Sequence, residues 1–150
     1  MVGKLPKSYH DFLFYFGSNV TFDGMVSFKS IEPSSWADSN GFDSIEYFYG
    51  LNETHDGYSI FDAIDVVKDD FNMKLIPIAF SSGGNQICVS TEMKKGAIWF
   101  WDHEVDPVFE KGEVISGVTL VSHNFNDFIK KLKVDNDTSP SKAIGGYLDF

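Results

Sequence analysis

The sequence contains a single cysteine, Cys88, so no disulfide can form within the chain. Residues 1–11 lack the apolar core of a secretory signal peptide. No run of about 18 apolar residues occurs, which excludes a membrane-spanning helix of ordinary length. These absences predict a soluble, cytoplasmic protein that folds without disulfide support.

Positive charge is also scarce. The chain has 12 Lys and Arg residues against 22 Asp and Glu, and its formal net charge is −10. Binding to nucleic acid or to an anionic membrane requires clustered cations, so we expect neither. A basic protein partner is compatible with this charge, because opposite charge speeds encounter. An acidic surface also serves solubility alone, so the charge does not assign a partner by itself.

Apolar residues, by contrast, are plentiful: 43% of the chain is hydrophobic and 16% is aromatic. A chain of 150 residues suits one domain. Apolar residues at helical spacing predict helices over 7–16, over 59–71 and from Ser122 or Asn124 to Leu132. Short apolar runs predict strands at 45–51, 75–80, 86–90, 97–101 and 118–121. Because these elements follow no strict βαβ rhythm, we expect an α+β fold with a largely antiparallel or mixed central sheet flanked by helices.

Local features refine this expectation. Asp23-Gly24, between apolar residues 20–22 and 25–28, predicts a two-residue hairpin turn. Pro77 predicts an edge strand or a bulge, because proline cannot donate to a sheet ladder. Residues 32–43 read as a loop. Residues 1–134 are expected to form the domain, and residues 135–150 a C-terminal tail that is either linker-like or docked on the domain.

The segment 75–104 contains most of the residues that suggest chemistry. Ser81–Asn85 lacks the spacing and the lysine of a phosphate loop, and a strand pattern follows it, so a glycine turn is predicted. Cys88 lies between apolar neighbours, which favours a buried small residue over a reactive thiol. No catalytic residue and no cofactor site is predicted.

Asp102-His103-Glu104 raises the question of a metal site. If the segment continues a strand, Asp102 and Glu104 share one face and His103 points to the other. No His-x3-His or Cys-x2-Cys spacing accompanies it, so we expect no metal and interpret the triplet as the polar end of a strand. Acidic residues are too numerous for any pair to indicate a glycosidase.

The three tryptophans allow two interpretations. Trp99 and Trp101 share one face of a predicted strand whose other face is also apolar, which favours core packing in a central strand. An exposed aromatic patch that binds a partner is the alternative, and it includes Trp36.

Several motifs together resemble the SUKH superfamily. They are the opening Leu5-Pro6-x-Ser8-Tyr9-x-x-Phe12-Leu13, the central Ile76-Pro77-Ile78-Ala79, Gly83-Gly84-Asn85-Gln86-Ile87-Cys88-Val89 and Gly96-Ala97-Ile98-Trp99-Phe100-Trp101-Asp102-His103-Glu104, and the closing Ser122-x-x-Phe125-x-x-Phe128-Ile129-x-x-Leu132. The likeness spans residues 5–132, and its central motif is the most specific part. The chain departs from the family in having only four residues before Leu5, where members usually carry another helix.

This resemblance implies a sheet flanked by helices and a role in binding rather than catalysis. Bacterial members of the superfamily look like immunity proteins that neutralise toxins, often nucleases. Fungal relatives regulate cell-wall glucan synthesis through protein contacts. A scaffold or regulatory protein of that second kind is therefore the alternative function. An enzyme or small-ligand carrier is a third, which a deep pocket with converging polar groups would support.

For an immunity protein with a basic toxin as its partner, two acidic groups are the candidate contacts: Asp62, Asp65 and Asp69 on one helix face, and Asp102, Glu104 and Asp106 after the strand. Each group is equally consistent with ordinary solvent-exposed surface that contacts no partner. Charge is expected to raise the association rate, and apolar contacts to hold the complex.

Overall fold

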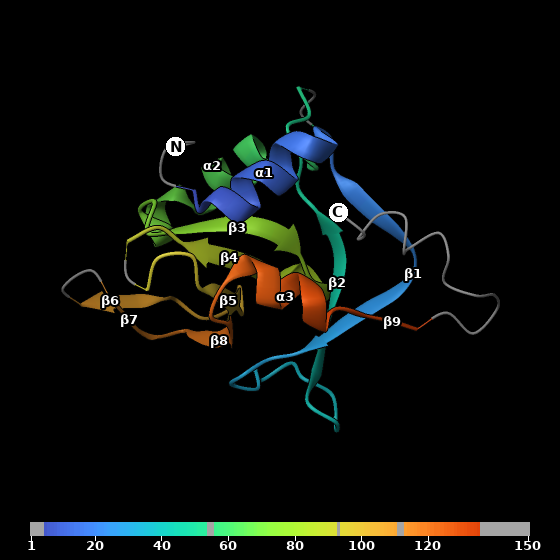
Figure 1. Cartoon of the computed structure of the whole chain (residues 1–150). Helices are drawn as coiled ribbons and strands as arrows, with labels where there is room; N and C mark the ends of the chain where they lie inside the picture. Colours follow the sequence, from blue (N-terminus) through green and yellow to red (C-terminus); the bar gives the residue numbers. More distant parts are fainter. Residues whose placement is uncertain (1–4, 54–55, 93, 111–112, 136–150) are drawn as a thin grey trace.

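The computed structural model describes residues 5–53, 56–92, 94–110 and 113–135, and these form a single α+β domain (Figure 1). In chain order the elements are α1 (Lys7–Phe16), β1 (Val20–Lys29), β2 (Phe42–Phe48), α2 (Ile60–Phe71), β3 (Leu75–Phe80), the short 3₁₀ turn η2 (Ser82–Gly84), β4 (Gln86–Ser90), β5 (Ile98–Trp101), β6 (Val108–Glu110), β7 (Glu113–Ser116), β8 (Val118–Ser122), α3 (Phe125–Lys131) and β9 (Lys133–Asp135). Seven strands pair in the order β8-β5-β4-β3-β2-β1-β9, and β6 and β7 form a separate hairpin. Every pairing is antiparallel. The predicted fold class is confirmed.

The two faces of the large sheet carry different elements. α1 and α3 lie over one face, in front of the sheet in Figure 1. The rings that fill the core on this side are those of Tyr9, Phe12, Phe28, Phe48, Phe125 and Phe128. The other face packs against the C-terminal half of α2 through Val67 and Phe71. Apolar residues on both faces of β3, β4 and β5 make these strands the centre of the domain.

The helices begin and end where the sequence places them. α1 ends at Gly17, whose φ of +72° suits glycine and whose N–H donates to Leu13 O at 3.0 Å. Ser59 caps α2 by accepting a hydrogen bond from the Phe61 N–H at 3.1 Å. Asn124 caps α3 in the same way, accepting from Asp127 N–H at 2.8 Å. Apolar periodicity and capping residues agree at each helix, so these predictions are confirmed.

The hairpin predicted at Asp23-Gly24 is wrong. β1 runs without reversal from Val20 to Lys29. Its pairing with β2 shifts register between Thr21 and Val26, so the intervening residues form a bulge rather than a turn. Pairing with β2 on one side and β9 on the other outweighs the local turn preference of Asp-Gly.

Pro77 lies in an interior strand, because β3 is flanked by β2 and β4. The edge-strand interpretation is therefore wrong, and the bulge interpretation is confirmed by a register shift between Pro77 and Ala79 against β4. β2 begins at Phe42, earlier than the predicted Ile45, so the preceding loop is slightly shorter than expected.

Residues 31–41, called here the Trp36 loop, connect β1 to β2 and first run beside β8. Ile31 N–H donates to Val121 O at 3.2 Å, and Glu32 N–H donates to Leu120 O at 2.8 Å. The Glu32 carboxylate in turn accepts the Leu120 N–H at 2.8 Å. The outer edge of β8 is therefore covered by the chain itself at Leu120 and Val121.

The tail predicted at 135–150 lies outside the described residues from residue 136 onward. Among the helices that the structure describes, none is long and apolar enough to cross a membrane.

Candidate partner-binding surface

The connection between β3 and β4 is a tight turn, as predicted. Gly83 and Gly84 have φ values of +76° and +92°, which side chains of other residues rarely allow. Ser81 N–H closes the turn by donating to Asn85 O at 2.8 Å. β4 starts at Gln86, so no helix N-terminus is present to hold a phosphate.

Cys88, Trp99 and Trp101 are core residues on the α2 face of the sheet. Cys88 is fully buried, and burial raises the pKa of its thiol. That shift disfavours the thiolate that a nucleophile needs. The Trp101 ring packs edge-on against Phe71 of α2, with 4.7 Å between centroids. The core interpretation of this tryptophan pair is confirmed.

The acidic segment after β5 is a turn, called here the 102–106 turn. β5 ends at Trp101, and Val105 N–H donates to Asp102 O at 3.0 Å. The strand geometry expected for Asp102 and Glu104 is therefore wrong, because the extended backbone stops one residue earlier. Asp102 is partly buried, and its carboxylate accepts Glu104 N–H at 3.0 Å and Ser35 Oγ–H at 3.3 Å. Glu104 and Asp106 are exposed.

His103 joins this turn to the glycine turn. Its backbone N–H donates to Asn85 Oδ1 at 3.2 Å, and its ring Nδ1 lies 2.8 Å from the same oxygen. Asn85 is fully buried and donates from Nδ2 to Ser82 O at 3.1 Å. These contacts give His103 a structural role. Within the residues that the structure describes, no three His, Cys, Asp or Glu side chains gather to hold a metal ion.

Asp62, Asp65 and Asp69, called here the α2 acidic arc, lie on the helix face opposite the core. Ile60, Val67 and Phe71 are buried, whereas Asp65 and Asp69 are exposed and Asp62 is partly buried. Asp65 forms an ion pair with Lys68 at 3.0 Å, but both side chains are more than half exposed. Such a pair adds little stability, so Asp65 remains accessible to a partner.

Two apolar residues that sequence reasoning passed over flank this arc. Phe61 is 51% exposed and Val66 is 80% exposed. At about 100° per residue, they lie roughly 40° beyond either side of the acidic arc. Their position outside the apolar stripe was visible in the sequence and is the pattern that identifies them. Acidic residues bordered by exposed apolar ones resemble the polar and apolar mixture of protein interfaces.

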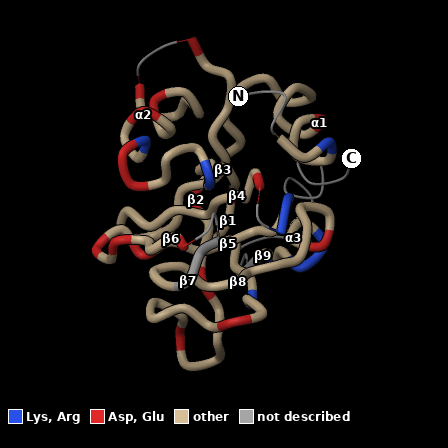
Figure 2. The backbone as a smooth tube through the Cα atoms, turned by 90° about the vertical axis from the view of Figure 1, so that its left-hand side faces the viewer, with Lys and Arg blue, Asp and Glu red and all other residues tan. Residues whose placement is uncertain are grey.

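Trp101 connects the C-terminal end of α2 to the 102–106 turn. Its ring touches Phe71 at the end of α2, and its Nε1–H donates to Val105 O at 2.7 Å. The end of α2 and the 102–106 turn are therefore both in contact with Trp101, on the same face of the sheet. Figure 2 shows acidic residues on α2 and near β6 on the side that faces the viewer.

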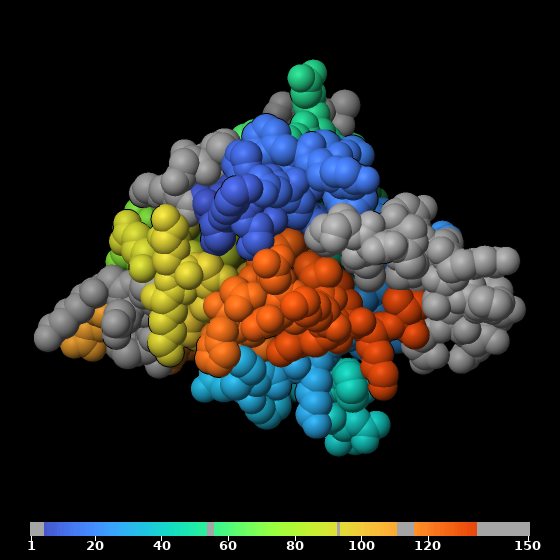
Figure 3. All heavy atoms as spheres, in the orientation of Figure 1, coloured from blue at the N-terminus to red at the C-terminus, as the bar shows by residue number. Residues whose placement is uncertain are grey.

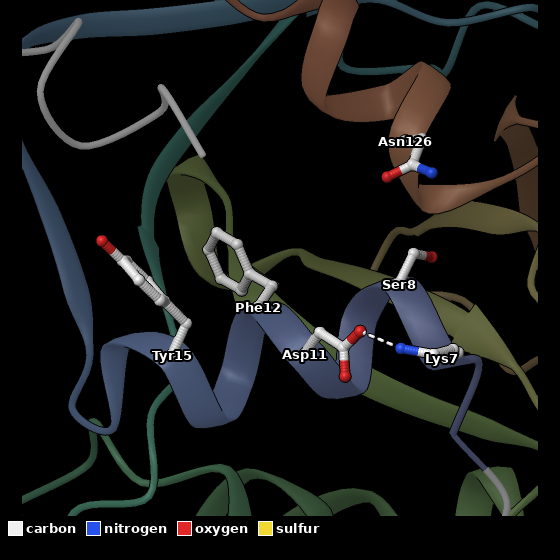
Figure 4. Close-up of a pocket in the computed structure, with 6 residues that line it drawn as sticks. All are labelled: Lys7, Ser8, Asp11, Phe12, Tyr15 and Asn126. Atoms are coloured by element: carbon white, nitrogen blue, oxygen red, sulfur yellow. Dashed lines mark hydrogen bonds and ion pairs between the residues drawn. The ribbon is translucent and has the colours of Figure 1, made fainter.

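A different cavity, of about 650 Å³, lies between α1 and α3. These two helices lie side by side in Figure 3, and Figure 4 shows the residues of the groove. Lys7, Ser8, Asp11, Phe12 and Tyr15 come from α1, and Asn126 from α3. Lys7 Nζ and Asp11 Oδ2 are paired at 2.6 Å, and Tyr15 is largely exposed. Because its two charges satisfy each other, the groove presents an open aromatic wall rather than converging reactive groups. Nothing in the sequence analysis predicted it.

Comparison with known proteins identifies similar sequences. The sequence model of the SMI1/KNR4 family (SUKH-1) matches residues 3–131. An SPbeta prophage-derived uncharacterized protein of Bacillus subtilis (strain 168), YokK, is 35% identical over 155 aligned residues, which cover 97% of this chain and 74% of the relative. The matched family region contains α1, α2 and α3 together with all strands from β1 to β8.

Proposed function

Because the chain belongs to the SMI1/KNR4 family (SUKH-1), we propose that it is a bacterial immunity protein that binds and neutralises a cognate toxin in the cytoplasm. Membership of this family across residues 3–131 is the observation that carries the proposal. The family is generally non-catalytic and its members are generally protein-interaction domains. We therefore expect the surface of this domain to bind another protein.

The contact surface in this proposal is the side of the molecule that bears the α2 acidic arc and the 102–106 turn. Its partner is a basic toxin domain, for example a nuclease whose nucleic-acid groove is cationic. With a net charge of −10, the chain attracts such a partner over distances near the Debye length. Phe61 and Val66 supply apolar area that stays in contact after encounter.

Growth rescue tests this proposal directly. The chain is co-expressed with the product of the neighbouring gene, and growth is compared with that of cells that make this product alone. Rescue, together with a stable complex in size-exclusion chromatography, is the expected result. If the chain neither rescues growth nor binds that product, the immunity proposal is wrong.

The same experiment separates the alternative role. A regulatory or scaffold protein, like the fungal relatives, forms a complex with a partner that is not toxic. Binding without toxicity of the partner therefore favours regulation over immunity.

A further inference from the structure

Trp36, unlike Trp99 and Trp101, lies outside the hydrophobic core. It is 44% exposed, yet its ring is held in one place. A Cβ at Gly83 would lie 2.7 Å from two carbons of the ring, so the indole rests directly on the glycine backbone. The backbone N–H of Trp36 also donates to Ser34 Oγ at 3.1 Å. An exposed ring that is already fixed loses little conformational freedom on binding, which is typical of interface anchors.

The Trp36 loop is pinned near the ring as well as at β8. Ser34 Oγ–H donates to Asp43 Oδ1 at 2.8 Å. Asp38 Oδ1 accepts the Phe42 N–H at 2.9 Å. The contact of Ser35 with Asp102 ties the loop to the 102–106 turn. The loop is therefore a preformed wall beside the proposed acidic surface.

A cavity of about 260 Å³ opens beside this wall, between the loop, β1, β2 and the glycine turn. Its lining includes Ser27, Trp36, Asp38, Phe42, Ser44 and Ser82. Serine hydroxyls, a carboxylate and two aromatic rings supply its chemistry, and its described lining contains no Lys, Arg or His. The volume is below the roughly 300 Å³ at which pockets for drug-sized ligands begin, so a single side chain fits better than a cofactor.

Negative charge at this cavity is not neutralised by its own described contacts. Asp43 also lines it, is 5% exposed, and has its Oδ2 buried without a hydrogen-bond partner. Burial raises the pKa of the Asp43 carboxyl, the hydrogen bond from Ser34 lowers it in part, and the Asp38 carboxylate raises it further. A cation in the cavity would relieve the repulsion between these two carboxylates.

The chain itself already brings one cation to this region. Lys133 Nζ lies 5.3 Å from the centroid of the Phe42 ring. It lines an adjoining cavity that shares Asp38 and Phe42 with the first. This contact shows that an ammonium group is accommodated over the Phe42 ring, in a cavity that Asp38 also lines.

We propose that the cavity beside Trp36 receives a basic side chain of the partner protein, arginine in preference to lysine. The Trp36 ring lies against the guanidinium plane, Asp38 accepts its N–H groups, and the serine hydroxyls complete the hydrogen bonding. Arginine is favoured because its planar, weakly hydrated cation stacks on an indole and pairs with a carboxylate at once. This inference rests on the proposed function, since it names the chemistry by which the toxin is recognised.

The test uses a capped arginine, N-acetyl-L-arginine methylamide, as the probe for the isolated protein. Its neutral isostere, the corresponding citrulline derivative, is the control. The measurement is the NMR shift of the indole N–H resonances during titration. Saturable movement of the Trp36 signal is expected with arginine, whereas the buried Trp99 and Trp101 signals stay in place. Equal movement with citrulline would show that charge is not recognised and would overturn the proposal.

Two variants test the same site by different routes. Asp38→Asn removes the charge and is expected to weaken arginine binding at least fivefold, while Glu92→Gln, which removes an equal charge at an exposed position outside the cavity, leaves it unchanged. Met25→Lys places an amine at the exposed rim of the cavity and is expected to block arginine, whereas Met25→Gln does not. Unchanged affinity in folded Asp38→Asn or Met25→Lys contradicts the proposal, and thermal melts establish that each variant is folded.

Failure of this inference is distinguishable from failure of the proposed function. Growth rescue without arginine binding leaves the immunity function in place and removes the cavity from it. Arginine binding without rescue keeps the cavity as a basic side-chain site and removes the toxin as its partner.

Discussion

The two faces of the large sheet are built for different purposes. Under α1 and α3, aromatic rings interlock: Phe12, Phe48 and Phe125 lie within 4.8 to 6.3 Å of one another, centroid to centroid. On the other side, α2 covers only part of the sheet, and the Trp36 loop and the glycine turn lie beside β1 and β2. One face carries most of the aromatic core, while the other leaves rigid side chains accessible.

The largest effect on stability is expected for the core under α1 and α3. Phe48→Ala removes a fully buried ring, and the expected loss is about 3–5 kcal/mol of unfolding free energy. Phe61→Ala on the second face removes a half-exposed ring and is expected to change stability by no more than about 0.5 kcal/mol. Urea denaturation measures both. Similar losses in the two variants would erase the distinction between the faces.

A smaller effect on stability is expected at the contact between Gly83 and the Trp36 ring, on the opposite face of the sheet. Gly83→Ala puts a Cβ at positive φ and against the Trp36 ring, whereas Gly57→Ala has a similar φ of +89° and nothing within 4 Å. Both variants share the backbone strain of about 1 kcal/mol, and Gly83→Ala is expected to lose about 1–3 kcal/mol more through displacement of the ring. Thermal melts give the stabilities, and the Trp36 indole resonance reports the displacement. If the two alanines are equally destabilising, the ring is not held by Gly83.

Changing Asp62, Asp65 and Asp69 to Lys is expected to slow association with a basic partner at least tenfold and to flatten its salt dependence. Folding stability is expected to change little, because these side chains are on the helix surface. Stopped-flow association at several salt concentrations measures the effect.

Two controls locate the contact. The same charge reversal at Asp11, Asp23 and Glu92, which are also exposed, changes the net charge equally. Tyr15→Ala alters the α1–α3 groove without altering charge. If the control charge reversal slows association as much as the reversal on α2, the rate depends only on net charge and the contact is not on α2. If Tyr15→Ala slows association, the contact lies at the α1–α3 groove instead.

The smallest effect concerns Asp43. Burial raises the pKa of this carboxyl, so the native state binds its proton more tightly than the unfolded chain does. The protonated Asp43 carboxyl therefore adds to the free energy of unfolding at pH values below its pKa in the unfolded chain, near 3.9. This contribution is lost as the pH rises through the pKa of Asp43 in the folded protein. Asp43→Asn is therefore expected to gain stability over the parent as pH rises from about 4 to 7, by no more than about 1 kcal/mol. Denaturation curves across that range measure it, and a constant difference would contradict the linkage.

Sequence reasoning was most reliable where several local preferences agree. α1 and α2 combine apolar periodicity with a cap or a terminating glycine, and both lie where predicted. Asp23-Gly24 misled because its turn preference is local, while β1 is held by partners from residues 42–48 and 133–135. The end of β5 at Trp101 matches the predicted strand over 97–101, whereas the turn over residues 102–106 was not predicted.

The candidate surface was only partly predictable for a related reason. The acidic arc follows from helix geometry alone, so Asp62, Asp65 and Asp69 could be grouped in advance. Trp36 could not be separated from Trp99 and Trp101, because its environment comes from Gly83, which lies far away in the chain. Contacts between distant segments decide which aromatic ring is buried and which is presented.

The cover that Ile31 and Glu32 place on β8 has a consequence for self-association. An unpaired strand edge invites another chain to extend the sheet, and this leads to aggregation or to strand exchange. At β8 the Leu120 N–H, the Leu120 carbonyl and the Val121 carbonyl are already bonded to residues 31 and 32. These bonds oppose extension of the sheet at Leu120 and Val121, where a partner is therefore met by side chains rather than by free strand backbone.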